Sequence, residues 1–244
     1  MDQTFNQYLS VPGIEGPSKN QLHYTQNKAG GSGVTIGRGL DLAKHSDKDL
    51  ENMEISEVVR KKLTPYLGLT GNEAKKYDKK ASPLTYEEYV DVIDKTVNYK
   101  FKRIEEKFNK DSKIGDFNTL PKKLQYMIGS VYYQMGDSNP KKTAKSFWKQ
   151  VTTGDWQGLE ENMDISKYPN KGFGMLQTVK NNQTGKMEKV PFNAGNNRRN
   201  LEWNLLKESG WNVEKLNQHY KAKSKDEASL IQNWKIEDNP FNLA

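Results

Sequence analysis

Residues 29–41 read AGGSGVTIGRGLD, and the whole chain is best interpreted outward from this stretch. Its glycines surround the short run VTI, a composition that disfavours a helix and favours a tight β-hairpin. In a straight strand, side chains two residues apart share a face, and here these are Thr35, Gly37, Gly39 and Asp41. Six residues of straight strand span about 20 Å, too far for Thr35 and Asp41 to act on one bond. We therefore predict a bend at Gly37 or Gly39.

Glycine-rich turns also bind phosphate, but the spacing here does not fit that function. A Walker loop ends in Gly-Lys-Ser/Thr, and a dinucleotide loop has the spacing G-x-G-x-x-G. Gly31, Gly33 and Gly37 instead give G-x-G-x-x-x-G. The segment can instead be interpreted as a hairpin that faces a substrate, in which Gly37 and Gly39 let a polymer approach the backbone. A purely structural hairpin is the alternative.

The rest of the chain is predicted to be mostly helical. Apolar residues at steps of three and four predict a long amphipathic helix from Thr85 to about residue 108, with a capping box formed by Thr85 and Glu88. A second helix is expected over about 121–135, ending at Gly136. Weaker patterns predict further helical stretches at about 3–10, 47–63, 141–153, 156–163, 196–209, 213–221 and 225–235. The runs 175–179 and 187–192 predict a second hairpin.

These elements predict an α+β class that is mostly helical. The 244 residues suit one soluble domain or two small lobes. We expect a small lobe over 1–84, which carries the glycine-rich hairpin, and a helical lobe over 85–244, with an inserted hairpin near 174–192. Together they would form a single functional domain.

Residue types that are rare or missing exclude several kinds of site. The chain has no cysteine, which excludes cysteine nucleophiles, zinc fingers and iron–sulfur clusters. Its three histidines lie far apart in the sequence, so no metal site and no cofactor are expected. A net charge of +7 is a mild bias toward polyanionic partners such as an anionic cell-wall polymer, a membrane surface or nucleic acid, and a lysine-rich solvated surface is the favoured interpretation. Nucleic acid is not expected, because no groove-reading motif is present, and no apolar run is long enough to span a membrane.

Upstream of the hairpin, Glu15 lies in the segment PGIEGP, after the first predicted helix. A protonated glutamate, an ionised aspartate and a hydroxyl that holds a water are the groups that glycoside hydrolysis needs. Glu15, Asp41 and Thr35 would supply them. The chain has 31 acidic residues, so residue types alone still favour a structural hairpin over this constellation.

The order of these motifs resembles the active-site region of phage-type muramidases. The likeness is greatest to the branch of the pesticin toxin domain and related bacterial toxin lysozymes, and it rests on IEGP at 14–17 and GVTIGRGLDL at 33–42. Downstream, YMIGSVYYQMGD at 126–137 is similar to a core helix of phage lysozyme, and SFW and TGDW resemble the following helices. NRRNLE at 197–202 is similar to the segment that packs beside the catalytic glutamate.

The resemblance implies a phage-lysozyme-like, two-lobed fold with an active-site cleft. It implies that Glu15 is the general acid, Thr35 the hydroxyl that positions water and Asp41 the second carboxylate. In T-even phage lysozyme the aspartate precedes the threonine, whereas residues 24–34 here contain no acidic side chain. Asp41 substitutes for it, as in the toxin branch.

Three further residues are candidates for supporting roles. The resemblance implies that Arg198 or Arg199 pairs with Glu15. Gln134, near the end of the predicted second helix, is a candidate for hydrogen bonding to sugar or, alternatively, for a helix cap. Aromatic residues at helical spacing are expected in the core rather than as sugar platforms.

The function implied by the resemblance is a peptidoglycan muramidase, which cleaves between N-acetylmuramic acid and N-acetylglucosamine. An antibacterial secreted effector or toxin, delivered for example by a type VI secretion machine, is favoured. The alternatives are a phage endolysin and a non-catalytic peptidoglycan-binding module. No Sec signal is visible, so we expect synthesis in the cytoplasm and action in the periplasm or cell wall of a target or host bacterium. Expected partners are peptidoglycan, an immunity protein and a secretion carrier, and the chain is expected to be a monomer.

Overall fold

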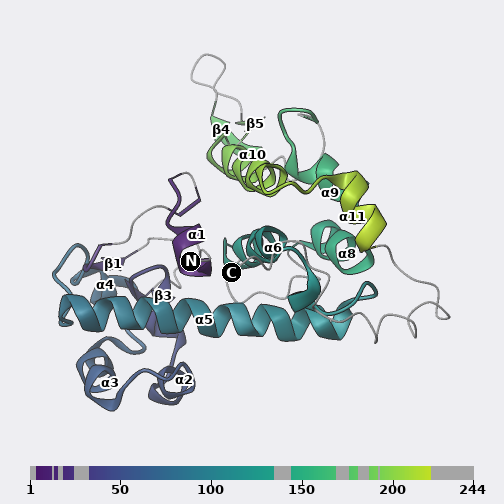
Figure 1. Cartoon of the computed structure of the whole chain (residues 1–244). Coiled ribbons are helices and arrows are strands. Elements are labelled where there is room, and N and C mark those ends of the chain that lie inside the picture. Colours follow the sequence, from purple (N-terminus) through teal and green to yellow (C-terminus); the bar gives the residue numbers. More distant parts are fainter. Residues whose placement is uncertain are drawn as a thin grey trace. The chain divides into compact units, whose positions relative to one another are not determined.

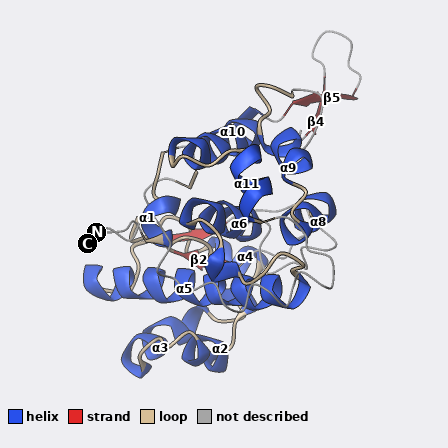
Figure 2. Cartoon of the chain, turned by 45° about the vertical axis from the view of Figure 1, so that its right-hand side comes forward, coloured by secondary structure: helices blue, strands red, loops and turns tan. Residues whose placement is uncertain are grey.

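The computed structural model describes residues 4–12, 14–15, 19–24, 33–134, 144–168, 176–180, 187–191 and 193–220. Helices make up most of the described chain, beside a three-stranded and a two-stranded antiparallel sheet (Figure 2). This confirms the predicted α+β, mostly helical class. The chain divides into two compact units: unit 1 comprises residues 1–106 and 129–134, and unit 2 comprises 107–128 and 135–244. The lobes expected over 1–84 and 85–244 stay a prediction.

Unit 1 holds most of the long helix α5 (Tyr86–Asp111), which is labelled in Figure 1. Its capping box is confirmed: the Glu88 N–H donates to Thr85 Oγ1 (3.3 Å), and the Thr85 N–H donates to Glu88 Oε2 (2.9 Å). The unit also contains residues 129–134 of α6 (Lys122–Gln134). Its short helices are α1 (Phe5–Leu9), α2 (Asp47–Asn52), α3 (Glu57–Leu63) and α4 (Gly71–Lys75), with 3-10 turns at Leu42–Lys44 and Thr64–Tyr66.

The predicted helical stretch 47–63 is wrong as a single element. It forms two helices, α2 and α3, because Glu54 between them has a positive φ of 62°, which no α-helix contains. Ser56 then starts α3 as its N-cap, accepting the Val59 N–H at 3.4 Å. Apolar residues continue at helical spacing through the break, so the sequence pattern does not reveal it.

The sheet of unit 1 has the strand order β1 (Leu22–Tyr24), β2 (Val34–Ile36) and β3 (Leu40–Asp41), all antiparallel. The predicted bend between β2 and β3 is confirmed at both glycines. Gly37 has φ 61° and Gly39 has φ 87°, in the left-handed region that glycine enters without a Cβ penalty. The glycines therefore turn the chain back on itself within three residues.

Within its described residues, unit 2 is helical apart from one hairpin. Its helices are α8 (Lys145–Thr153), α9 (Trp156–Met163), α10 (Asn193–Glu208) and α11 (Val213–His219), with a 3-10 turn at Phe117–Thr119 and the remainders of α5 and α6. β4 (Leu176–Lys180) and β5 (Met187–Pro191) pair antiparallel, which confirms the second predicted hairpin. The predicted helices are confirmed where described, whereas the helix at 225–235 and the cap at Gly136 lie outside the described residues.

Each unit has an aromatic core. In unit 1, the Phe5 and Phe101 ring centroids lie 4.5 Å apart, and a Cβ at Gly129 would come within 2.9 Å of both rings. In unit 2, the centroids of Phe108 and Phe117 lie 5.4 Å apart. Of the aromatic residues expected in the core, Tyr133 is only half-buried, and the others are buried: Tyr126, Tyr132, Phe147, Trp148 and Trp156.

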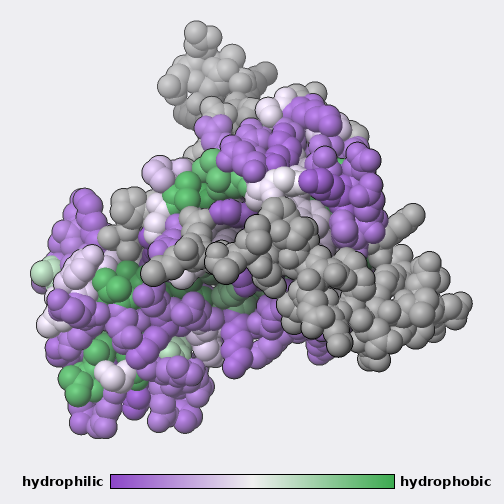
Figure 3. Space-filling model, viewed as in Figure 1, coloured by the Kyte–Doolittle hydropathy of each residue, from purple (hydrophilic) through white to green (hydrophobic). Residues whose placement is uncertain are grey.

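The described surface is largely polar. Hydrophilic residues dominate the described part of the face in Figure 3. The exposed large hydrophobic side chains of the described chain are Val58, Tyr86 and Val90. None of the described helices combines the length and the hydropathy that a membrane span requires.

Candidate active site

The hairpin of unit 1 brings Thr35 and Asp41 together. These residues are direct partners in the antiparallel register of β2 and β3, so their side chains leave the same face of the sheet about 5 Å apart. Their neighbours Val34, Ile36 and Leu40 are buried, which places Thr35 and Asp41 on the other, less buried face. The bend therefore converts a separation along the sequence into a pair of adjacent polar groups.

The Asp41 carboxylate is held in one orientation. Its Oδ1 accepts the backbone N–H groups of Gly33 and Ala43, each at 3.2 Å, and its Oδ2 lies 3.2 Å from Lys44 Nζ. The Asp41 side chain is 15% exposed, whereas that of Lys44 is 66% exposed. A Cβ at Gly33 would lie 2.7 Å from Asp41 Oδ1 and would also collide with Ala43, so only glycine allows this approach.

Glu15 lies in a tight turn that follows α1. The Ile14 N–H donates to Val11 O (3.0 Å), and the Glu15 N–H donates to Leu9 O (3.1 Å). Ile14 is buried and anchors the turn, whereas Glu15 is exposed. The residue proposed as the acid is thus attached to the end of a helix through its own backbone.

The structure adds Arg38, which the sequence did not single out. Its Nη1 donates to Leu9 O (3.2 Å), and its Nη2 donates to Ser10 Oγ (2.6 Å). Burial lowers the pKa of the Arg38 guanidinium, while the nearby Tyr133 and Glu15 act in the opposite direction. A single arginine in a glycine-rich turn gives no sequence signal for such a role.

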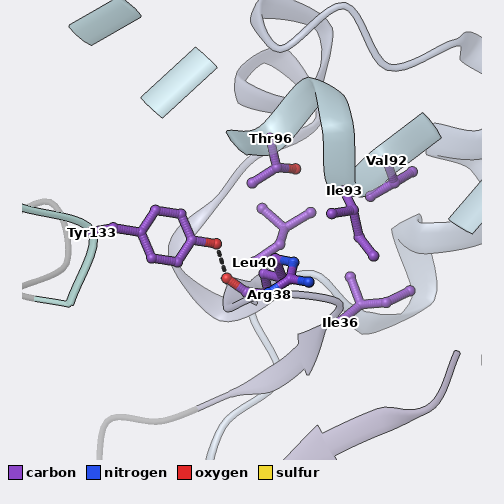
Figure 4. A pocket seen from close by; sticks show the side chains of 7 residues that line it. All are labelled: Ile36, Arg38, Leu40, Val92, Ile93, Thr96 and Tyr133. Atoms are coloured by element: carbon purple, nitrogen blue, oxygen red, sulfur yellow. Dashed lines mark hydrogen bonds between the residues drawn. The ribbon is translucent and has the colours of Figure 1, made fainter. Parts of the chain in front are cut away.

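The backbone of the turn is also fixed from two helices. The Tyr133 hydroxyl on α6 donates to Arg38 O, as Figure 4 shows, and Lys100 Nζ on α5 donates to Gly39 O at 3.3 Å. Lys100 is buried, with its Nζ 4.7 Å from the centroid of the Tyr133 ring. The side chains around Arg38 in this small pocket are Ile36, Leu40, Val92, Ile93, Thr96 and Tyr133 (Figure 4).

The predicted substrate-binding residues have different surroundings. A Cβ at Gly37 would lie 2.7 Å from Ile93 Cγ1, so packing against α5 is itself a reason for glycine there. Gly39 is exposed, with nothing within 4 Å of its Cβ position, and Gln134 is exposed at the end of α6. Contact of these three residues with substrate stays a prediction.

His23 is a second residue that the sequence did not single out. It is the direct partner of Thr35 in the β1–β2 register and is half-buried, so His23, Thr35 and Asp41 form a row across the three strands. The pairing of His23 with Thr35 follows from the β1–β2 register and not from their positions in the sequence. In the part of the chain that the structure describes, no group of three His, Cys, Asp or Glu side chains is placed to hold a metal ion.

The predicted supporting arginines form a buried ionic cluster on α10. Arg198 Nε donates to Glu202 Oε1 (3.0 Å), and Arg199 Nη1 donates to Glu202 Oε2. All three side chains are at most 5% exposed. The pairing of Arg198 or Arg199 with Glu15 stays a prediction.

Comparison with known protein families assigns most of this chain. Residues 7–157 match the family described as Pesticin, the bacterial toxin homologue of phage lysozyme, C-terminal part. This match covers more than half of the sequence and includes Glu15, Thr35 and Asp41. The chain belongs to the pesticin family. The predicted family and phage-lysozyme-like fold are thereby confirmed, and membership of the pesticin family suggests glycoside hydrolase activity of the lysozyme type.

The pesticin match does not extend over the whole chain. Helix α10, with its Arg198–Glu202 cluster, and the β4–β5 hairpin lie beyond residue 157. Among curated proteins, no similar sequence was found. The family assignment therefore rests on the part of the chain that carries the hairpin and the turn after α1.

Proposed function

We propose that this member of the pesticin family is a muramidase that hydrolyses the bond between N-acetylmuramic acid and N-acetylglucosamine in peptidoglycan. The observation that carries the proposal is the direct pairing of Thr35 with Asp41 in a hairpin whose turn bonds, through Arg38, to the end of α1 just before Glu15. All of these residues lie within the family match.

Each of the three residues has a role that its surroundings support. Exposed Glu15 donates a proton to the leaving glycosidic oxygen. Asp41, held by two backbone N–H groups and close to Lys44, either stabilises the oxocarbenium-like charge or activates water. Thr35, opposite it, orients the water that adds to the anomeric carbon. One water is consumed, and the product is a new reducing end at N-acetylmuramic acid.

The biological setting follows from the toxin family and remains part of the proposal. We infer an antibacterial effector that acts on peptidoglycan in the periplasm or cell wall of a bacterium and whose partners include an immunity protein and a secretion carrier. A phage endolysin, or a peptidoglycan-binding module without turnover, would share the fold. Expression in a Gram-negative host, with and without an added periplasmic signal peptide, tests the site of action. We expect lysis only with the signal peptide and only with an intact Glu15.

The chemistry is tested by digesting purified peptidoglycan and identifying the soluble fragments by mass spectrometry. Wild type is compared with Glu15→Gln, which removes the acid with little change in shape. Glu87→Gln, the same change at an exposed position of α5, is the matched control. We expect reducing N-acetylmuramic acid ends from wild type and Glu87→Gln and none from Glu15→Gln.

Other products would contradict the proposal in distinct ways. Anhydro-muramic ends would indicate a lytic transglycosylase, in which Asp41 activates no water. Reducing N-acetylglucosamine ends would indicate a glucosaminidase. Binding of peptidoglycan without any release would favour the non-catalytic module.

A further inference from the structure

Arg38 lies between the two halves of the candidate site. It belongs to the turn that separates Thr35 from Asp41, yet its guanidinium reaches the end of α1. There, Leu9 O accepts both Arg38 Nη1 (3.2 Å) and the Glu15 N–H (3.1 Å). One carbonyl oxygen thus bonds to the hairpin on one side and to the backbone of Glu15 on the other.

The bonding of this helix end explains why a cation suits it. The last carbonyls of a helix lack intrahelical donors and carry partial negative charge. A guanidinium there supplies both the missing donors and a positive charge. Ser10 Oγ donates to Asn6 O (2.9 Å) and therefore offers a lone pair to Arg38 Nη2 at 2.6 Å. The planar fork of arginine reaches both acceptors at once, which the single ammonium of lysine does less well.

The other contacts of the turn do not make this connection. Tyr133 and Lys100 bind the backbone carbonyls of Arg38 and Gly39, so they fix the turn to α6 and α5. Only the Arg38 side chain is bonded to Leu9 and Ser10 among the described contacts of the turn. The two kinds of contact can therefore be removed separately.

We propose that Arg38 is a positioning residue, which fixes the turn carrying Glu15 relative to the hairpin carrying Thr35 and Asp41. The proposal rests on the muramidase function proposed above. A general acid must lie within hydrogen-bond reach of the leaving oxygen, and a misplacement of about 1 Å can lower the rate about 100-fold. Without the Arg38 guanidinium, the turn after α1 keeps its own bonds, but the end of α1 loses the two bonds from the hairpin that Arg38 supplies.

The test compares Arg38→Met and Arg38→Lys with Tyr133→Phe. Methionine suits the apolar lining of the pocket but donates no hydrogen bond. Tyr133→Phe removes a bond to the same turn and leaves the Arg38 side chain in place. Ser10→Ala, which removes only the acceptor of Nη2, is the milder variant should Arg38→Met fail to fold.

Two readouts separate positioning from a general loss of structure. Turnover of solubilised glycan strands should show a kcat about 10- to 100-fold lower for Arg38→Met, with KM within about threefold, and partial recovery in Arg38→Lys. Hydrogen exchange at the Glu15 amide should be at least about tenfold faster in Arg38→Met and unchanged in Tyr133→Phe. Ser10→Ala should show both effects more weakly.

The contrary outcomes are equally distinct. An active wild type beside an unchanged kcat in Arg38→Met would overturn the role of Arg38 and leave the muramidase function standing. Equal losses in Arg38→Met and Tyr133→Phe would assign Arg38 to stability alone. A wild type that releases no fragments would overturn the proposed function and this role together.

Discussion

The polar side chains around the candidate site of unit 1 and those of the α10 cluster in unit 2 have different neighbours. In unit 1, Arg38, Lys100 and Tyr133 donate to backbone carbonyls in the turns around the candidate site. In unit 2, Arg198 and Arg199 donate to the carboxylate of Glu202 on their own helix. These side chains thus hold loops in place in unit 1 and pair within one helix in unit 2. We infer that substitutions of Arg38 act mainly on activity and those in the α10 cluster mainly on stability.

The largest loss of stability is expected from Glu202→Gln. Glu202 is fully buried, so Glu202→Gln removes the negative charge that faces two buried guanidinium groups. We expect the free energy of unfolding to fall by about 3–5 kcal/mol. The measurement is chemical denaturation followed by fluorescence, because all five tryptophans belong to unit 2. Glu208→Gln, at an exposed position of the same helix, is the control and should change little. Equal effects of the two variants would show that burial of the cluster contributes nothing.

Gly33→Ala should combine a smaller loss of stability with a loss of activity. The new Cβ would lie 2.7 Å from Asp41 Oδ1, so the carboxylate must move, and overpacking of this kind costs about 2–3 kcal/mol. Gly68→Ala is the comparison: its φ of 73° costs about 1 kcal/mol, but nothing lies within 4 Å of the added carbon. Peptidoglycan digestion should be lost in Gly33→Ala alone. Full activity in Gly33→Ala would show that the reaction does not depend on the orientation of the Asp41 carboxylate.

The substitution of threonine by valine should change stability in opposite directions at two buried positions, Thr96 in unit 1 and Thr152 in unit 2. Thr96, 3% exposed on α5, buries its hydroxyl with no hydrogen-bond partner among the residues that the structure describes, so Thr96→Val should stabilise by about 1 kcal/mol. Thr152, 4% exposed on α8, donates to Trp148 O at 2.7 Å, so Thr152→Val should destabilise by about 1 kcal/mol. Thermal unfolding of both variants measures the difference, and changes of the same sign would contradict it.

The smallest effect is expected at Asp164, in unit 2. Burial alone raises the pKa of its carboxyl group, but hydrogen bonds from Ser166 Oγ (2.6 Å) and the Lys167 N–H (3.1 Å) outweigh burial and lower it. A lowered pKa gives stability that is present above the pKa of the unfolded chain and is lost as the pH falls below about 4. Stability measured between pH 3 and 7 should therefore depend less on pH in Asp164→Asn. If the pH dependence of stability were the same in Asp164→Asn as in wild type, these hydrogen bonds would not favour the charged form of Asp164.

Much of this fold follows from local sequence patterns. The glycines of residues 29–41 predict the bend, where two of them take a positive φ, and the period of apolar residues predicts α5 and α6. The same period hides the break at Glu54, because a single left-handed residue leaves no trace in hydropathy. Strands as short as β1, with three residues, give too little alternation to be recognised.

The candidate site was only partly predictable, because local sequence patterns do not show contacts between distant segments. Thr35 and Asp41 could be paired once a bend was required between them. Arg38 and His23 could not be found, because their roles arise from contacts between distant segments: the turn with α1, and β1 with β2. Gly37 was assigned to substrate approach, whereas its contact with Ile93 supplies a packing reason that the sequence does not show.

The measurement that most directly tests whether the hairpin and the turn after α1 form one active site is a double-mutant cycle. Glu15→Gln, Asp41→Asn and the double variant are compared for the rate of release of reducing N-acetylmuramic acid from peptidoglycan. Residues that act as a unit are far from additive, so we expect the double variant to be no slower than the slower single variant. Losses that multiply, or a single variant that keeps full activity, would show that Glu15 and Asp41 do not serve one reaction.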